Sequence, residues 1–537
     1  MTEQFAYPDD ILTEVFIGSS WVDLSSYVVD AIDIDGGIMG NSPTDKMAYI
    51  GGTRFTLNNN SGIFTPNTID TLSGWKKGIK VRHVIYFEGV PYVIFVGKIK
   101  KIGLPYTVEE DSLVPVSTVD WLDDASNHNV TLQGIETDIT TGAAAQILLD
   151  ASPVQPEGIE IDIGSDTISA FFTDTDKDST TYSELGKLAL TEFAFVYLKE
   201  DRLLGRVLKV ESRQSRVSVE PTSIVASKTN SPRLRLQNGK FLKLQNDAIF
   251  LLNKSIQPIF DNMTGMDTEF GENLINHITV TNNKPRVDTS LQVLFNLDEP
   301  IRINAGQTLP DLKVSYKDPT GGSGRVNGKD MQPAASGTDY AMFANQNGTG
   351  TNLTANLTFT VEYGSSGAVY RSPTNTGGTD GWITKLQARG YGVYSENPIE
   401  LFLEDQPSIE EFGLSVMSID NAYQSNMSVS ETIATTTLGQ NKDNRVVPTK
   451  IKLIANLNSQ LMIAYLMLGV GNLIQVKQDK HQINDNFFIQ SKKSRIHQGG
   501  VIEFEFGLVD ALFANETYWE LDIDGKSELE ETTFISF

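Results

Sequence analysis

The sequence of 537 residues contains no cysteine and only five histidines. Without cysteine the chain has no disulfide framework, no thiol nucleophile and no thiolate ligand for zinc or an iron–sulfur cluster. No two of the histidines lie three or four residues apart, which excludes a helical histidine pair that binds a metal. They are His83, His128, His277, His481 and His497. We therefore expect no metal and no cofactor, and only a site built from distant histidines and carboxylates stays open.

Long hydrophobic runs are also missing. The longest, Leu461 to Gly471, is about half as long as a bilayer span requires. Acidic residues such as Glu3 and Asp9 stand where a signal peptide needs a basic and then an apolar segment. We expect a soluble protein made in a cytoplasm, without stable membrane insertion, in which residues 461–468 form a buried helix.

The chain is poor in positive charge. It has 43 Lys and Arg against 68 Asp and Glu, a net charge of -25, which argues against a free-standing binder of duplex DNA. Hydrophobic residues make up 39% and charged residues 21%, so the chain is not a disordered tail. Its length predicts three or four domains.

Most of the sequence has the pattern of β-strands. Short apolar runs are broken by Gly, Asn, Asp and Pro, and helical periodicity is rare. Ile32–Asp35 and Phe55–Leu57 read as strands, and 80–87 and 90–96 read as a hairpin that turns at Glu88-Gly89. Residues 1–120 therefore predict a small antiparallel barrel or sandwich.

Helices are expected in few places. Residues 141–151 and 179–192 predict two helices, the second capped by Ser179 or Thr180, and a hairpin over 193–210 completes an α+β unit at 121–220. Two more helices are predicted at 382–390, closed by Gly390, and at 459–468. Strands are expected at 473–476, 487–490 and 501–507. The segment 301–404 is rich in Gly, Thr, Asn and Ser and predicts an inserted β-sandwich, and 516–537 predicts an acidic C-terminal tail.

The sequence contains near matches to metal-binding and nucleotide-binding motifs, but each lacks a residue that the motif requires. Asp174-Thr175-Asp176-Lys177-Asp178 has the spacing of a calcium loop, but Ser179 and Leu185 stand where that loop needs Gly and Glu. The pairs Asp33/Asp35 and Asp522/Asp524 are explained equally well by exposed surface. The segment 323–330 misses the phosphate-loop pattern at Ser323 and Asp330, and 469–471 lacks the third Gly of a dinucleotide fingerprint. We assign no catalytic, cofactor-binding or metal-binding residue, and expect no enzyme.

Several stretches, in this order, resemble the tail hub proteins of the baseplate or tail tip of long-tailed phages. Trp21, Asp23 and Val28 match the family's opening motif, with Leu24 where Val is commoner, and Phe412 stands where Tyr is expected. The other matching stretches are 51–59, 62–66, 78–82, 92–99, 339–340, 347–350, 386–390, 408–413 and 419–424.

The resemblance implies a mainly β, multidomain fold with two hub-type β-barrels. The barrels would be residues 1–120, and 221–300 together with 405–515, with the α+β unit between them and the 301–404 insert facing outward. It implies a homotrimer in the virion, at the phage tail tip, assembled in the host cytoplasm, that adapts the sixfold tube to a threefold tip and leaves a channel for the genome. Implied partners are a distal tail or tube protein, the tape measure protein and tip fibre or spike proteins, with DNA passing without specific binding.

Other functions stay open at this stage. The insert could bind a receptor or a host surface glycan, and a distal tail ring protein is a further alternative. Some hubs carry a C-terminal cell-wall hydrolase, but this chain ends soon after the expected second barrel, so we expect none. The acidic balance fits either a channel wall that repels phosphate or simple solubility.

Overall fold

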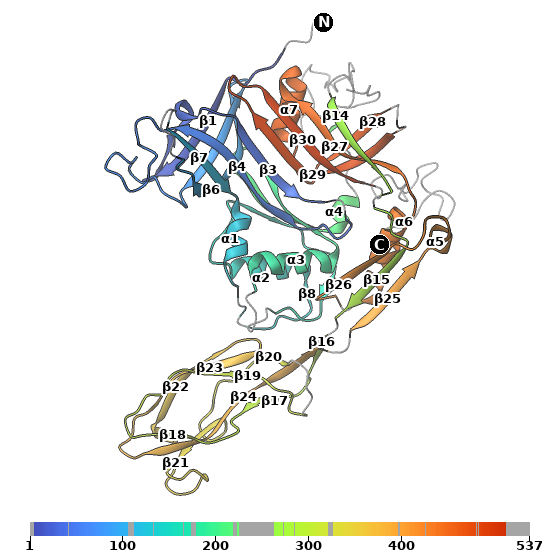
Figure 1. Cartoon of the computed structure of the whole chain (residues 1–537). Helices are drawn as coiled ribbons and strands as arrows, with labels where there is room; N and C mark the ends of the chain where they lie inside the picture. Colours follow the sequence, from blue (N-terminus) through green and yellow to red (C-terminus); the bar gives the residue numbers. More distant parts are fainter. Residues whose placement is uncertain are drawn as a thin grey trace, which may run out of the picture.

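The computed structural model describes residues 5–511 except 41, 106–111, 131, 133, 165, 173–178, 218–222, 225–262, 272, 284, 321–325, 396–397, 425, 479–480 and 482. The chain is mainly β, with several sheets, a smaller α+β part and a long arm (Figure 1). The predicted fold class is therefore confirmed.

One large sheet of thirteen strands dominates the body. Its main path runs in space through β14 (Met263–Phe270), β27 (Val446–Ile454), β30 (Ile502–Asp510), β29 (Ile483–Ile496), β3 (Ile32–Ile38), β4 (Ala48–Asn58), β7 (Leu113–Val119), β6 (Val90–Ile102), β5 (Lys80–Phe87), β1 (Asp10–Ile17) and β2 (Ser20–Asp23). β28 (Leu473–Gln478) pairs with β29 and with β13 (Ser223–Ile224). Strands from the two ends of the chain thus share one sheet, joined where β29 meets β3.

The sequence led us to expect two hub-type β-barrels, and this expectation needs correction, because no closed barrel forms among the described residues. Along the described residues the strand path runs open from β14 to β2, and both halves bury side chains in one core, among them Phe95, Phe487 and Phe506. The physical reason is the pairing of β3. Its free edge bonds to β29 over six residues, so it cannot close the N-terminal half on itself.

The two halves of this sheet repeat one strand order. β3-β4-β7-β6-β5 in the first half corresponds to β14-β27-β30-β29-β28 in the second. Both long strands carry an irregularity at the same place, after Ile99 in β6 and after Ile489 in β29. Gly78 donates to the Ile99 carbonyl at 2.9 Å, and Gly471 donates to the Ile489 carbonyl at 2.9 Å. The repeat therefore extends to single hydrogen bonds, although the sequence shows no clean short-period repeat.

The α+β unit packs below the large sheet, where α1, α2 and α3 lie side by side (Figure 1). The two predicted helices and the hairpin are confirmed, and Thr180 caps α3 in a capping box with Ser183. The elements are α1 (Trp121–Asn127), β8 (Ile139–Thr140), α2 (Thr141–Asp150), β9 (Ile159–Ile161), β10 (Thr167–Ile168), α3 (Thr181–Glu192), β11 (Phe195–Asp201), β12 (Gly205–Glu211) and α4 (Arg213–Val217).

A small three-stranded sheet with a helix on one face connects the body to the arm. This unit was not predicted from the sequence, because its strands come from both sides of the insert. It consists of β15 (His277–Asn282), β25 (Ile399–Glu404), β26 (Val416–Asn421), α5 (Gln406–Phe412) and α6 (Met427–Asn441). The predicted helix α7 (Ser459–Met467) is confirmed, and Leu461, Met462 and Tyr465 bury it in the large core. The short 3-10 helices are η1 (Ser25–Tyr27), η3 (Thr354–Asn356) and η4 (Ala455–Leu457).

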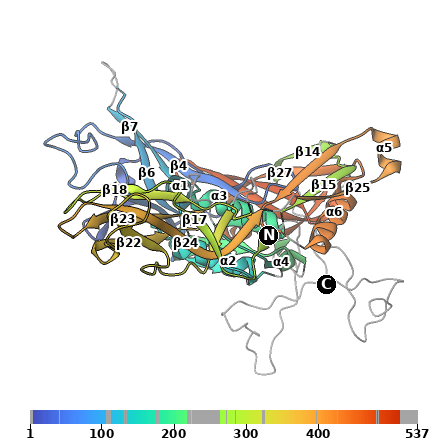
Figure 2. The same ribbon diagram turned by 90° about the horizontal axis from the view of Figure 1, so that it is seen from below.

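The arm is a β-structure that projects from the body (Figure 1) and overlaps the body when the molecule is seen from below (Figure 2). Its strands are β16 (Pro285–Val287), β17 (Gln292–Asn296), β18 (Ile301–Ile303), β19 (Leu312–Ser315), β20 (Val326–Lys329), β21 (Tyr340–Phe343), β22 (Leu357–Tyr363), β23 (Gly367–Asn375) and β24 (Gly381–Ser395). The helix predicted at 382–390 is wrong, because this segment lies in β24 and pairs with β17, β18 and β21, while the rest of β24 pairs with β16 and β20. Gly390 is needed for close approach to the Lys329 carbonyl and not as a helix cap.

Candidate functional surface on the large sheet

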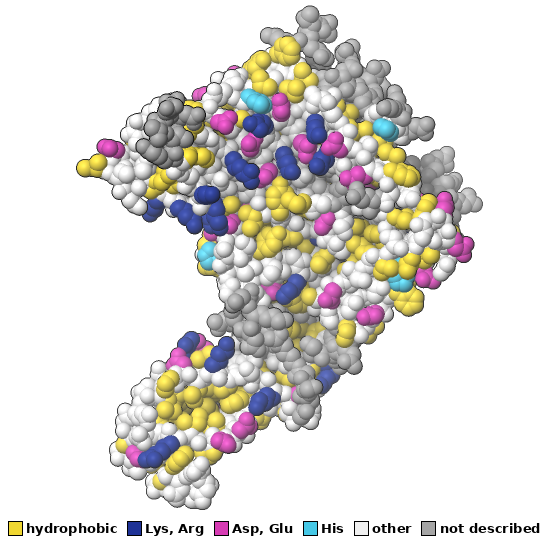
Figure 3. All heavy atoms as spheres, in the orientation of Figure 1, with side chains coloured by type: hydrophobic (Ala, Val, Ile, Leu, Met, Phe, Trp, Pro, Cys, Tyr) yellow, Lys and Arg dark blue, Asp and Glu magenta, His cyan; other side chains and the backbone are white. Residues whose placement is uncertain are grey.

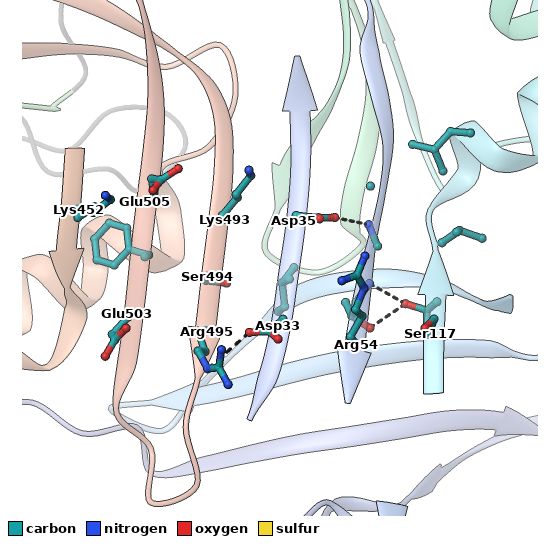
Figure 4. A pocket seen from close by; sticks show the side chains of 18 of the residues that line it. Asp33, Asp35, Arg54, Ser117, Lys452, Lys493, Ser494, Arg495, Glu503 and Glu505 are labelled. Atoms are coloured by element: carbon teal, nitrogen blue, oxygen red, sulfur yellow. Dashed lines mark hydrogen bonds and ion pairs between the residues drawn. The ribbon is translucent and has the colours of Figure 1, made fainter. Parts of the chain in front are cut away.

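A hollow of about 790 Å³ lies over the joint between the two halves of the large sheet. Strands β27, β30, β29, β3, β4 and β7 form its floor, and their outward side chains line it (Figure 4). Because successive residues of a strand point to opposite faces, every second residue reaches this surface while its neighbours enter the core. Asp33 and Asp35, for example, flank the buried Ile34.

Opposite charges face each other across the strands of this surface. In one row, Arg54 pairs with Asp33, Asp33 with Arg495, and Arg495 with Glu503. In the next row the order is Asp35, Lys493, Glu505 and Lys452. We call these two rows the charge ladder. Figure 3 shows Lys and Arg interspersed with Asp and Glu on this face of the body.

The charge ladder specifies register more than it adds stability. The Arg495 and Asp33 side chains are 3.7 Å apart and about half exposed, and the Lys452 ammonium lies 3.2 Å from a carboxylate oxygen of Asp267. Exposed pairs of this kind contribute about 0.2–1 kcal/mol each. A shift of register by one residue would turn the charges into the core, so the correct pairing is favoured strongly.

The hollow does not carry the acidic excess of the chain. Its lining contains four acids (Asp33, Asp35, Glu503, Glu505) and five bases (Arg54, Lys100, Lys452, Lys493, Arg495). Alternating charges at such short spacing cancel over a few ångströms, so the surface neither strongly attracts nor strongly repels a polyanion. The net charge of -25 therefore resides elsewhere on the chain.

A buried ion pair beneath the joint attaches the α+β unit to the sheet. Arg206 of β12 reaches Asp120 at 3.4 Å, and its guanidinium also approaches the Asp35 carbonyl. The Asp120 carboxylate accepts hydrogen bonds from the backbone of Gly51 and Leu122. Burial raises the pKa of Asp120 to about 7, although Arg206 and the two backbone donors oppose the shift.

The structure gives a structural reason for most of the near matches to metal-binding and nucleotide-binding motifs. Asp33 and Asp35 belong to the charge ladder, Gly328 and Lys329 lie in strand β20 and not in a phosphate loop, and Gly471 forms a turn after α7. The calcium-like segment 174–178 and the pair Asp522/Asp524 lie outside the described residues. In the part of the chain that the structure describes, no three His, Asp or Glu residues group as metal ligands, and no helix is long and apolar enough to cross a bilayer.

The charge ladder was not predicted from the sequence, although the sequence contains a signal for it. Four strands each carry two like charges two residues apart: Asp33/Asp35, Lys450/Lys452, Lys493/Arg495 and Glu503/Glu505. Such a pair places both charges on one face of a strand. Two of these strands carry negative pairs and two carry positive pairs, which is an indication that strands of opposite charge lie side by side.

Comparison with known proteins gives matches among solved structures only. No family model and no curated protein matches the chain. A prophage MuSo2 43 kDa tail protein from Shewanella oneidensis is 10% identical, with a TM-score of 0.43 over 94% of this chain and 100% of that one. A tail protein from Neisseria meningitidis MC58 is 10% identical, with a TM-score of 0.44 over 94% and 99%.

A third similar structure comes from a secretion system. The Escherichia coli c3393 protein, described as a type VI secretion component with structural similarity to the T4 bacteriophage tail proteins gp27 and gp5, is 8% identical, with a TM-score of 0.33 over 93% of this chain and 84% of that one. These three similar structures are thus two tail proteins, one of them from a prophage, and a component of a type VI secretion system.

Proposed function

We propose that this chain is a structural subunit of a phage tail, and that three copies form the hub at the tail tip around a channel for the genome. The observation that carries the proposal is the repeated half of the large sheet. Two similar units are joined edge to edge within one chain at β3 and β29. A heterologous joint of this kind can recur between chains until the ring closes.

The expected symmetry follows from the repeat. Because each chain contributes two similar units, a ring of three chains would present six, which suits an adaptor between a sixfold tube and a threefold tip. The ordered sequence motifs support the same arrangement. Proposed partners are the tube or distal tail protein, the tape measure protein, and fibre or spike proteins at the tip.

We place the charge ladder on the channel wall. Its balanced charges favour passage of DNA without specific binding, because paired surface charges leave little net potential for phosphates. In this arrangement the acidic excess of the chain contributes to solubility, not to repulsion of the genome.

The test is the mass of the purified full chain, followed by imaging of intact tails. Light scattering should give three times 59.1 kDa, and a reconstruction of the tip should place three copies on the tail axis. Six copies in a ring would favour a distal tail protein. A stable monomer, or a peripheral position in the tail, would contradict the hub.

A second candidate function belongs to the arm, residues 285–395, which extends away from the body (Figure 1). It would bind a receptor or a surface glycan. Asn282 and Ile399 are cross-strand partners, so residues 283–398 can be replaced by a two-residue Asn-Gly turn without moving β15 or β25. Tails that assemble with this variant but no longer adsorb would support the candidate, and unchanged adsorption would remove it.

A further inference from the structure

Among the strand edges of the large sheet that have no partner in the described part of the chain are those of β14 and of the end of β6. β14 pairs only with β27. β6 loses its contact with β5 near Lys98 and then continues with β7 alone. Gly103 donates to the Pro115 carbonyl at 2.8 Å, so Ile102 and Leu104 direct their backbone groups away from β7. Open edges of this kind are templates for pairing with another chain.

The internal repeat identifies which edge fits which. In the repeat β14 corresponds to β3, and β6 corresponds to β29. β3 and β29 are already paired, antiparallel, with Ile34 opposite Ser494 and Gly36 opposite Lys492. The matching irregularities align Ile99 with Ile489, so Ile102 takes the place of Lys492 and Leu104 that of Ser494.

The same alignment can be made on the other strand. Asp33 lies opposite Arg54, and Asp267 lies opposite Lys450 at the corresponding place. Asp33 therefore corresponds to Asp267, which makes Thr268 the counterpart of Ile34 and Phe270 that of Gly36. Gly37 and Gly271, which follow, both have positive φ angles, +122° and +73°.

We infer that β14 of one copy pairs antiparallel with the end of β6 and the two residues that follow it in the next copy, with Thr268 opposite Leu104 and Phe270 opposite Ile102. The inference rests on the proposed ring and assigns its contact. The partner is a second copy of this chain, because the pairing that it repeats already exists within the chain. The large sheet then continues from chain to chain.

Exposed apolar side chains mark both edges. Phe270 is 68% exposed and Leu104 is 53% exposed, although most aromatic and aliphatic side chains of the neighbouring strands are buried. Pairing in the inferred register brings these two side chains to the same seam, where both lose contact with water. Removal of apolar side chains from water favours such an association. The seam thus combines backbone hydrogen bonds with an apolar contact.

Disulfide cross-linking tests the register, and the natural absence of cysteine makes the background clean. Directly opposite residues of an antiparallel pair have Cα atoms about 4.5–5.5 Å apart, which a disulfide can bridge. The test variant is Leu104→Cys with Thr268→Cys. The matched control is Leu104→Cys with Thr264→Cys, whose second cysteine lies four residues, roughly 13 Å, along the same strand.

The expected result is a covalent trimer from the double variant on a non-reducing gel after mild oxidation. An equimolar mixture of the two single variants should give covalent dimers and no trimer, because each pair then has one bond. The control should remain unlinked. Circular dichroism of the single variants checks that they fold.

Light scattering separates the two possible failures. If trimers form without a disulfide between positions 104 and 268, or if Thr264→Cys forms the disulfide equally well, the inferred contact between β14 and β6 is wrong. The proposal of a trimeric hub is then unaffected. Chains that stay single and unlinked overturn both.

Discussion

Replacement of Gly37 by alanine should weaken the joint between the two halves of the large sheet. Gly37 has a φ of +122°, and a Cβ atom built there would lie 2.4 Å from the Gln490 carbonyl oxygen and 2.5 Å from the Ser491 Cα. Both obstacles are backbone atoms of β29, so no side-chain movement relieves them. Backbone strain of about 1–3 kcal/mol and overpacking of about 1–3 kcal/mol give a loss of roughly 2–6 kcal/mol for Gly37→Ala.

Two other glycines provide matched controls for urea unfolding followed by circular dichroism. Gly62 has a φ of +75° and open space around its Cβ position, so Gly62→Ala should cost only about 1–2 kcal/mol. Gly186 lies in α3 with nothing within 4 Å, so Gly186→Ala should stabilise by about 0.5–1 kcal/mol. A midpoint for Gly37→Ala equal to that for Gly62→Ala would refute the argument that β29 blocks this position.

Three further predictions follow from the site and its support. Asp120 has a folded pKa of about 7, above its ordinary value of 3.8, so the folded state holds a proton that the unfolded state releases between those pH values. Its contribution to stability is therefore present at low pH and lost as the pH rises to about 7. The free energy of unfolding of Asp120→Asn should not fall over this pH range. Curves of unfolding free energy against pH that run parallel for the unsubstituted chain and the variant would contradict this prediction. Lys493→Glu should place three acids side by side with Asp35 and Glu505, and lower the unfolding midpoint more at low salt than at high salt. An effect independent of salt would count against the charge ladder. Thr180→Ala should cost about 1 kcal/mol through loss of the α3 cap, and Thr180→Ser should restore most of it in the same assay.

Local sequence patterns were sufficient where a segment's own chemistry decides its structure. Thr180 and Ser183 form the capping box at the start of α3. Glu88 and Gly89 form the turn of the hairpin between β5 and β6, and both have the positive φ that such a turn needs. The apolar run from Leu461 was correctly predicted to be a buried helix. In these places the hydrogen bonds that define the element join residues close in sequence.

Segments whose partners are distant were harder to interpret. Residues 382–390 have a helical appearance, yet β24 bonds to five strands that start as far away as Pro285. The N-terminal half reads as a barrel of its own until β29, more than 450 residues after β3, takes its free edge. Apart from the opposite charges of Asp33/Asp35 and Lys493/Arg495, neither pairing leaves a mark on the local sequence, because a strand edge accepts any backbone of suitable register.

The sequence by itself determined a mainly β, cysteine-free, acidic chain, the main helices of its α+β unit, and the ordered motifs of a tail hub. Tertiary structure decided that two halves with the same strand order merge into one open sheet, and that like-charged pairs on separate strands interleave into the charge ladder. The reason is physical: side-chain alternation and turn chemistry are local properties, whereas the choice of neighbour for a strand edge depends on which backbones meet in space.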